Sequence, residues 1–143
     1  RVTLADLDVP NPFDAAERFT SGLVRQAVSW TMGDRAIEAR HALSVVLGPF
    51  LGVNVQQNDQ TSKATLVSRS DIRFAPFELT STYPVIAADV IACDDVGVLL
   101  LPHLDVLAQA RPKARLLVNA AWTSASQADL ELDPATKARI ADL

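Results

Sequence analysis

The sequence predicts an α/β sandwich, a fold in which helices cover both faces of a mostly parallel sheet. Three features of residues 88–122 lead to this prediction. First, segments 88–93 and 114–118 are short and almost continuously apolar, as expected of strands that are buried on both faces. Second, the apolar run 98–110 between them has the length of a helix. Third, the whole stretch is about as long as a strand–helix–strand crossover between parallel strands requires.

Size and composition favour one soluble domain with its own core. The chain has 143 residues, of which 49% are hydrophobic. A net charge of −4 and a pI near 5.0 give no reason to expect nucleic acid or an anionic membrane as a partner. The nearly uncharged run 96–110 contains His103 and Asp105, which a membrane span would not tolerate. Cys93 is the single cysteine, so no internal disulfide can form, and a reducing compartment, the cytoplasm, is expected.

The first 25 residues are expected to form a linker with a short helix, and residues 26–143 the domain itself. Residues 11–14, Asn-Pro-Phe-Asp, are typical of a helix start. Asn11 can cap the helix, proline suits the first helical position, and Asp14 interacts favourably with the helix dipole. The sequence starts without Met and stops within an expected helix, so both ends are expected to be cuts from a longer polypeptide.

Residues 23–30 allow two interpretations. Their alternation predicts a strand, whereas the apolar spacing from Phe13 to Trp30 also fits one continuous helix. Asp34 can cap the next helix, on which His41 is expected to be solvated. The apolar residues of that helix recur at helical spacing and predict a face that packs on the sheet. That face consists of Ala36, Ala39, Leu43, Val46 and Phe50.

The rest of the chain supplies three further strands and a closing helix. A strand at 53–56 is followed by the polar run 57–63, whose turn-forming residues predict a loop. A strand at 64–74 comes next, and because only a loop joins the two, the pair is expected to be antiparallel. Residues 123–128 are expected to form a polar loop, and an Asp-Pro pair opens a final helix over 135–143. The resulting order is that of a Rossmann-like three-layer sandwich.

The turn after the first strand is the place where a nucleotide-binding α/β fold carries glycines. Backbone amides must approach a phosphate closely there. In this chain residues 30–36 contain Gly33 alone, and Asp34 puts a negative charge where the phosphate would lie. An ordinary capped turn is therefore the favoured interpretation.

A group of Cys, His and Asp residues follows the strand at 88–93. Cys93, His103 and Asp105 could bind zinc or supply a thiol nucleophile. The spacing repeats no ligand pattern, and the thiol directly follows an apolar strand, so a structural role is favoured. Asp94 and Asp95 are expected either as charges at a helix start or as ligand contacts at the carboxyl end of the strand.

Three cations and two tryptophans complete the candidate residues. Lys63, Arg69 and Arg73 either attract an anion such as a coenzyme phosphate or form a solvated strand face, and the second interpretation is favoured. Trp30 and Trp122 both end predicted strands, and a core or interface position at one rim of the sheet is expected for them.

A family resemblance is carried by four segments, IRFAPFELTSTY (72–83), ADVIAC (88–93), LDVL (104–107) and LLVN (116–119). Together they resemble the gamma domain of the pyruvate:ferredoxin (flavodoxin) oxidoreductase family, over about residues 30–143. The resemblance implies one domain of a large enzyme that uses thiamine diphosphate and iron–sulfur clusters to oxidise a 2-oxoacid to acyl-CoA. In that family the domain itself carries neither the thiamine nor a cluster and is associated with the coenzyme A side of the site.

This sequence departs from the family pattern in two loops. The family has a glycine-rich turn after its first strand and a Ser, Lys and Gly-Gly loop before its third, and here the second loop lacks both glycines. A side chain at such positions blocks the close backbone approach that a diphosphate requires. The resemblance implies no catalytic residue and no metal ligand in this domain. It places any remaining coenzyme contact at Gly33, Ser62, Lys63 and Asn119.

A second host is also compatible with the resemblance. A degenerate copy of this domain occurs near the amino end of the fungal-type sulfite reductase flavoprotein subunit, and DVGVLLLPHLD (95–105) resembles that version. The domain would then be a non-catalytic scaffold beside modules for FAD, FMN and NADPH. Either host implies other domains or subunits of a larger oxidoreductase as partners. A stand-alone binding module is the third interpretation.

Overall fold

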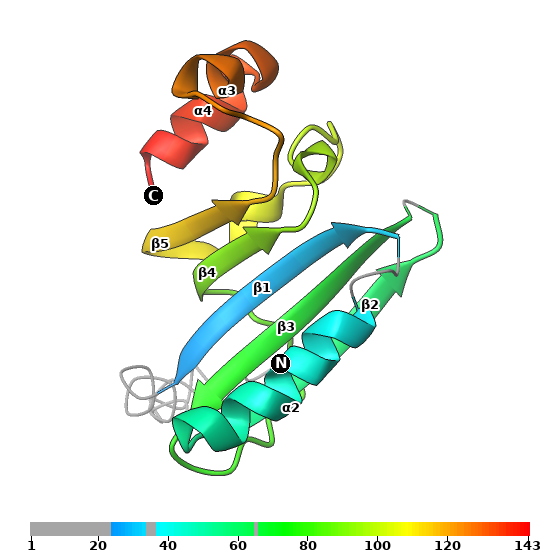
Figure 1. Ribbon diagram of the computed structural model, residues 1–143, viewed down its shortest axis with the longest axis vertical. Coiled ribbons are helices and arrows are strands. Elements are labelled where there is room, and N and C mark those ends of the chain that lie inside the picture. The colour runs from blue at the N-terminus through cyan, green and yellow to red at the C-terminus, as the bar shows by residue number, and fades with distance from the viewer. Residues whose placement is uncertain (1–23, 34–36, 65) are drawn as a thin grey trace, which may run out of the picture.

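The computed structural model describes residues 24–33, 37–64 and 66–143, and a five-stranded open sheet forms its centre (Figure 1). The strand order is β2-β3-β1-β4-β5. The strands are β1 (Arg25–Met32), β2 (Asn54–Ser62), β3 (Val67–Ala75), β4 (Ala88–Cys93) and β5 (Ala110–Val118). Strand β1 is parallel to β4 and β4 to β5, whereas β3 is antiparallel to both β1 and β2. Four strands therefore run in one direction, and the predicted α/β class and antiparallel pair are confirmed.

The strand predicted over residues 23–30 is confirmed as β1, and the continuous-helix alternative is wrong. Alternate residues of a strand point to opposite faces of the sheet. Val28 and Trp30 therefore share one face, and Ser29 and Thr31 share the other; all four are buried. The helix predicted at the amino end and the proposed cap Asp34 lie outside the described residues.

Strand β2 is longer than the sequence predicts, and the loop predicted over 57–63 is wrong for most of its length. The polar residues of this run form a regular ladder with β3, in which Asp59 pairs with Ser70 and Thr61 with Ser68. Strand β2 is an edge strand, where polar side chains can reach water. The ladder bonds come from the backbone, so turn-forming side chains do not prevent the strand.

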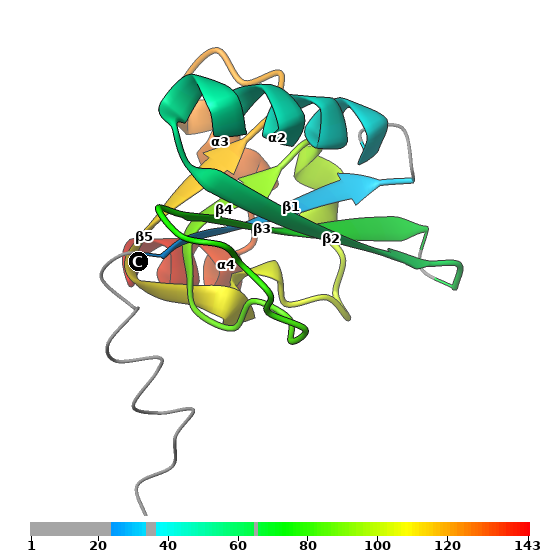
Figure 2. The same cartoon turned by 90° about the horizontal axis from the view of Figure 1, so that it is seen from below.

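Helix α2 (Ile37–Leu51) packs against β2 and β3, but not through the residues predicted (Figure 2). Arg40 and Ser44 are each 7% exposed, and Gly48 is also buried. Val46 and Phe50 are 64% and 83% exposed, so the predicted apolar face is wrong at these positions. The strand faces beneath α2 carry hydroxyl and carboxylate groups, which need polar partners when buried. Three side chains of the predicted face lie outside what the structure describes: Ala36, Ala39 and Leu43.

The connection from β4 to β5 contains two short 3-10 turns, Val96–Val98 and Val106–Gln109, where the sequence predicts a helix over 98–110. That prediction is wrong. Asp95 caps the first turn by accepting from the Gly97 amide at 2.7 Å, and Asp105 caps the second turn in the same way. Pro102 lies between them and has no amide to continue a helix. The run is apolar because it joins the core, through Val98, Leu99, Val106 and Leu107.

The apolar core lies on the sheet face opposite α2. Figure 2 shows α2 on one side of the sheet and the connections on either side of β4, with α4 (Pro134–Ala141), on the other. Helix α3 (Ala125–Glu131) occupies much of the segment predicted as a polar loop, and α4 confirms the predicted closing helix. Both tryptophans pack in or against the core as predicted, Trp30 from within β1 and Trp122 beyond β5. No helix in the described ranges combines the length and apolar character needed to cross a bilayer.

Candidate functional site

The carboxyl ends of β1, β2, β4 and β5 lie along one edge of the sheet, called the carboxyl edge below. Open α/β sheets bind ligands at such an edge. Gly33 follows β1, Ser62 ends β2 and is followed by Lys63, and Asn119 follows β5, so all four predicted contact residues lie here. They do not meet at one point. Four strand spacings separate the ends of β2 and β5, or about 19 Å at the usual spacing of about 4.8 Å.

The turn at Gly33 is closed by a hydrogen bond within the protein. Gly33 has a φ of +75°, the left-handed conformation that favours glycine. Its amide donates to the carbonyl oxygen of Leu66, in the turn between β2 and β3, at 2.5 Å. A phosphate-binding turn needs amides that are free to point at the ligand. The two loops that the resemblance assigns to a coenzyme are instead bonded to each other.

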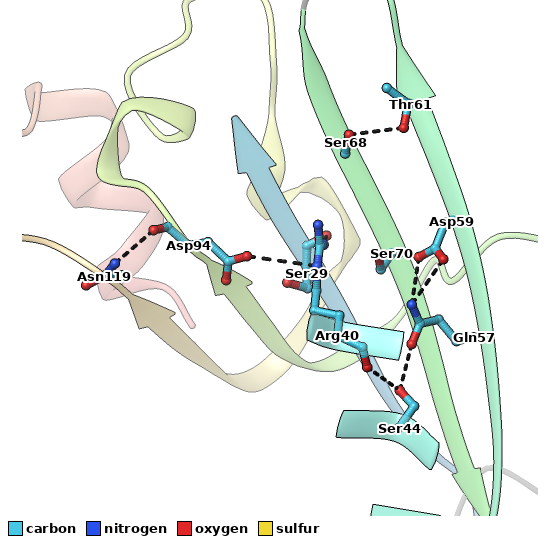
Figure 3. Close-up of polar contacts among 10 residues, drawn as sticks. All are labelled: Ser29, Arg40, Ser44, Gln57, Asp59, Thr61, Ser68, Ser70, Asp94 and Asn119. Carbon is cyan, nitrogen blue, oxygen red and sulfur yellow. Dashed lines mark hydrogen bonds and ion pairs between the residues drawn. The ribbon is translucent and has the colours of Figure 1, made fainter. Parts of the chain in front are cut away.

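Asn119 also donates hydrogen bonds within the protein, from both its backbone amide and its side chain. Its amide donates to the Cys93 carbonyl at 2.9 Å, and its Nδ2 donates to the Asp94 carbonyl at 3.0 Å (Figure 3). These bonds connect the loops that follow β4 and β5. Ser62 and Lys63 are exposed at the far end of the same edge. Of the four predicted residues, Gly33 and Asn119 thus support the fold directly.

A polar cluster that the sequence interpretation missed lies on the α2 side of the sheet, partly beneath the helix (Figure 3). Its signal was present in the alternating hydroxyls of β3 and in polar residues four positions apart on α2. We call this cluster the polar layer. Its members are Ser29, Arg40, Ser44, Gln57, Asp59, Thr61, Ser68, Ser70 and Asp94.

Arg40 is the central cation of the polar layer. Its Nη1 donates to the Ser29 carbonyl at 2.9 Å, and its Nε lies 3.9 Å from Oδ2 of Asp94. Burial lowers the pKa of Arg40, and the carboxylates of Asp94 and Asp59 oppose that shift. An arginine retains its charge under such conditions. Arg40 therefore links α2 to β1 and to the end of β4, while Asp95 takes the predicted role at a helix start.

The hydroxyls of the polar layer form chains of hydrogen bonds that, within the described residues, include no histidine or lysine. The Ser44 hydroxyl lies 2.7 Å from Oε1 of Gln57, and Nε2 of Gln57 donates to Asp59 at 2.9 Å. The Ser70 hydroxyl also donates to Asp59. Nucleophilic serines are most often activated by histidine or lysine, and these bonds include neither. The one carboxylate, Asp59, is already bonded to Gln57 as well as to Ser70. The polar layer is therefore suited to holding α2 on the sheet rather than to acyl transfer.

The group formed by Cys93, His103 and Asp105 is not assembled as a site. The Cys93 thiol is 2% exposed, and burial, with a smaller effect of Asp94, raises its pKa to about 12. His103 is exposed, and Asp105 pairs with Arg139. Within the described residues no three His, Cys, Asp or Glu side chains are arranged to hold a metal ion. A buried thiol with a raised pKa stays protonated at neutral pH, which makes it a poor nucleophile.

Arg69 and Arg73 have structural partners on the core side of β3. Arg69 pairs with Asp71 at 2.6 Å and donates to the Val85 carbonyl at 2.6 Å. Arg73 is 1% exposed and donates to the Tyr83 carbonyl at 2.7 Å. Both arginines hold the connection before β4 against the sheet. They are neither an anion site nor the solvated strand face that the sequence favours.

Comparisons with known proteins give likenesses among solved structures alone. No family model matches the sequence. A search of the curated proteins found no match. Among solved structures, the chain is similar to subunit PORC of pyruvate oxidoreductase (EC 1.2.7.1) from Thermotoga maritima, with a TM-score of 0.53 and 14% identity. The similarity covers 70% of this chain and 52% of that one, so this chain spans about half of the subunit's length. At this identity the likeness shows the fold.

Proposed function

We propose that this chain is a gamma-type domain of a multidomain 2-oxoacid oxidoreductase of the pyruvate:ferredoxin/flavodoxin type, in which its coenzyme loops have degenerated. The family resemblance of segments 72–83 and 88–93 supports this, and so does the fold likeness to subunit PORC of a pyruvate oxidoreductase. Thiamine diphosphate, iron–sulfur clusters and coenzyme A then belong to the host enzyme. The domain's partners are the other domains or subunits of that enzyme.

The observation that carries the scaffold role is the hydrogen bond from the Gly33 amide to the Leu66 carbonyl. A diphosphate binds where several backbone amides converge without protein acceptors. Here the one glycine of the first turn donates to the neighbouring hairpin. Binding a coenzyme phosphate at Gly33 would first require that bond to break.

The chemistry of the described residues is also consistent with a non-catalytic scaffold role. The Cys93 thiol has a raised pKa, and in this part of the chain the hydrogen bonds of the polar layer join its hydroxyls to Gln57 and Asp59 but to no histidine or lysine. A catalytic site needs a nucleophile, an acid–base pair or a metal in mutual reach. Reactions of the host enzyme would therefore take place on other domains, while the polar layer keeps α2 and the sheet in a fixed arrangement.

Titration with coenzyme A, followed by amide NMR spectra of the whole chain, tests the scaffold role. We expect no shift at Gly33, Ser62 or Asn119 up to millimolar ligand, and the Lys63→Ala variant should behave identically. Binding at micromolar strength, about 8 kcal/mol, would overturn the proposal if it shifted Gly33 and disappeared in Lys63→Ala.

The nature of the host is tested by the modules encoded with this domain. We expect modules that bind thiamine diphosphate and iron–sulfur clusters. Flavin and NADPH modules would instead indicate the sulfite reductase flavoprotein, with the same scaffold role for this chain. A catalytic centre assembled at the carboxyl edge in the purified host would contradict both.

A further inference from the structure

A cavity of about 440 Å³ opens at the amino ends of β1 and β4, at the edge of the sheet opposite the carboxyl edge. We call it the amino-edge cavity. Its volume lies within the range of small-molecule sites, about 300 to 1,000 Å³. The lining residues come from β1, β3, β4 and β5: Arg25, Gln26, Ala27, Phe74, Asp89, Val90, Lys113 and Arg115.

Positive charge predominates around the amino-edge cavity. Three cationic side chains and one carboxylate line it, a net of +2, although the chain as a whole carries −4. The carboxylate of Asp89 is already engaged. It accepts from the Gln26 amide at 2.8 Å and from Arg111 at 2.6 Å, and it lies 3.5 Å from Arg25. The charges of Lys113 and Arg115 are therefore not balanced by Asp89, and the cavity favours an anion.

One wall of the cavity is apolar. Ala27 and Val90 are paired neighbours on β1 and β4, and Phe74 lies opposite Arg25 on β3. All three side chains are partly buried. A flat apolar group placed against this wall would bury surface that is now wet. Small-molecule sites typically combine such a wall with a few polar groups that orient the ligand.

A backbone irregularity places Lys113 at the cavity. The β4–β5 register shifts between the pairs Ala88–Ala110 and Val90–Arg115, so extra residues of β5 bulge out. Lys113 has a φ of +67°, rare for a residue with a Cβ, and its amide donates to the Leu143 carbonyl. Such strain persists only where the surroundings hold it, and bulges commonly redirect side chains at binding sites.

We propose that the amino-edge cavity binds a small organic anion. Its carboxylate or phosphate group interacts with Lys113, Arg115 and Arg25, and its flat apolar body packs against Phe74. The site is separate from the carboxyl edge. It therefore stands independently of the scaffold role proposed above.

Amide NMR titrations of the whole chain with benzoate and with phenyl phosphate test this proposal. We expect saturable shifts at Ala27, Val90 and Arg115 with a Kd of about 1 mM or tighter for at least one probe. The tighter probe identifies the anionic group as carboxylate or phosphate. Inorganic phosphate should bind at least about tenfold more weakly, because it lacks the apolar body.

Variants that remove positive charges distinguish specific binding at the amino-edge cavity from non-specific attraction of anions to the protein. In the double variant Lys113→Gln, Arg115→Gln we expect affinity to fall at least about tenfold. The variant Lys63→Gln removes another exposed positive charge, at the carboxyl edge, and should leave the affinity unchanged. The unliganded spectrum of each variant reports whether the fold is intact. No saturable shift with either probe, or equal binding by the double variant, would overturn the proposal.

Discussion

Leu66 holds a backbone conformation that leucine rarely adopts. Its φ is +54°, and its side chain is 66% exposed. Burial of the side chain therefore contributes little stability to offset the backbone strain. The left-handed region costs a residue with a Cβ roughly 1–2 kcal/mol. Glycine avoids this strain, but its greater freedom in the unfolded chain lowers stability by about 0.5–1 kcal/mol. We expect Leu66→Gly to raise the free energy of unfolding by up to about 1 kcal/mol in urea titrations.

The matched control is Leu66→Ala, which retains a Cβ and should bring no such gain. The Gly33 bond to residue 66 uses its backbone carbonyl and should survive both changes. A glycine variant less stable than the alanine variant would show that the turn at Leu66 is not strained.

Arg40 is a second residue whose role can be measured alone. It is buried, and Arg40→Met removes both its hydrogen bond to the Ser29 carbonyl and its ion pair with Asp94. We expect the variant to lose about 1–3 kcal/mol of unfolding free energy. Arg139, which pairs with Asp105 on the surface, offers the comparison, since Arg139→Met should cost about 0–1 kcal/mol. Equal effects of the two variants would mean that the polar layer does not stabilise the fold.

Helix α2 has one face that should tolerate substitution and one that should not. A Cβ at Gly48 would lie 3.1 Å from Cγ2 of Val55 and 3.3 Å from the Val53 carbonyl oxygen. Val46 points to solvent. We expect Gly48→Val to destabilise by about 1–3 kcal/mol through overpacking, and Val46→Lys to stay within about 0.5 kcal/mol. Thermal unfolding of the two variants checks the contrast, and a larger loss for Val46→Lys would reverse the assignment of the packing face.

Helices and strands could be predicted from the sequence where the pattern of apolar residues matches the side chains that the fold buries. Consecutive apolar residues correctly predicted β4 and β5, which lie next to each other in the sheet. The same criterion failed for residues 98–110, because an irregular buried connection is as apolar as a helix. Helical spacing correctly predicted α2 as a helix but gave the wrong packing face at Val46 and Phe50, since the buried residues described on α2 include the polar Arg40 and Ser44. Periodicity identifies a helix face, but the chemistry of the surface beneath decides which face is buried.

For the molecule as a whole, the buried thiol of Cys93 should make the folded state less stable at alkaline pH. Its pKa is raised from 9.0 to about 12 in the folded chain, chiefly by burial. Above pH 9 the unfolded thiol loses its proton while the folded one keeps it, so the folded state binds more protons and its stability falls as pH rises toward 12. Below pH 9 this contribution is fully present.

We expect the urea midpoint of the native chain to fall between pH 8 and about 10.5, and to fall less in Cys93→Ala. The comparison uses the change with pH in each protein, so any cavity left by the smaller side chain cancels. Identical pH dependence in both would show that the thiol is not protected by burial.

At the scale of the molecule, the α/β class could be predicted. The carboxyl edge collects Gly33, Ser62, Lys63 and Asn119 because β3 lies antiparallel between β1 and β2, a strand order that the sequence did not predict. Their bonding could not be predicted, since the partner of the Gly33 amide lies in a hairpin 33 positions further along the chain. The amino-edge cavity was equally hidden, because it combines four strands with a bulge that no local pattern marks.

Hydrogen exchange at the Gly33 amide tests the scaffold role most directly. If this amide is bonded to Leu66 in the ligand-free chain, it should exchange at least about 100-fold more slowly than an unstructured amide. Coenzyme A at millimolar concentration should leave that rate unchanged. Exchange at the unstructured rate, with protection appearing only when coenzyme A is added, would contradict the scaffold role.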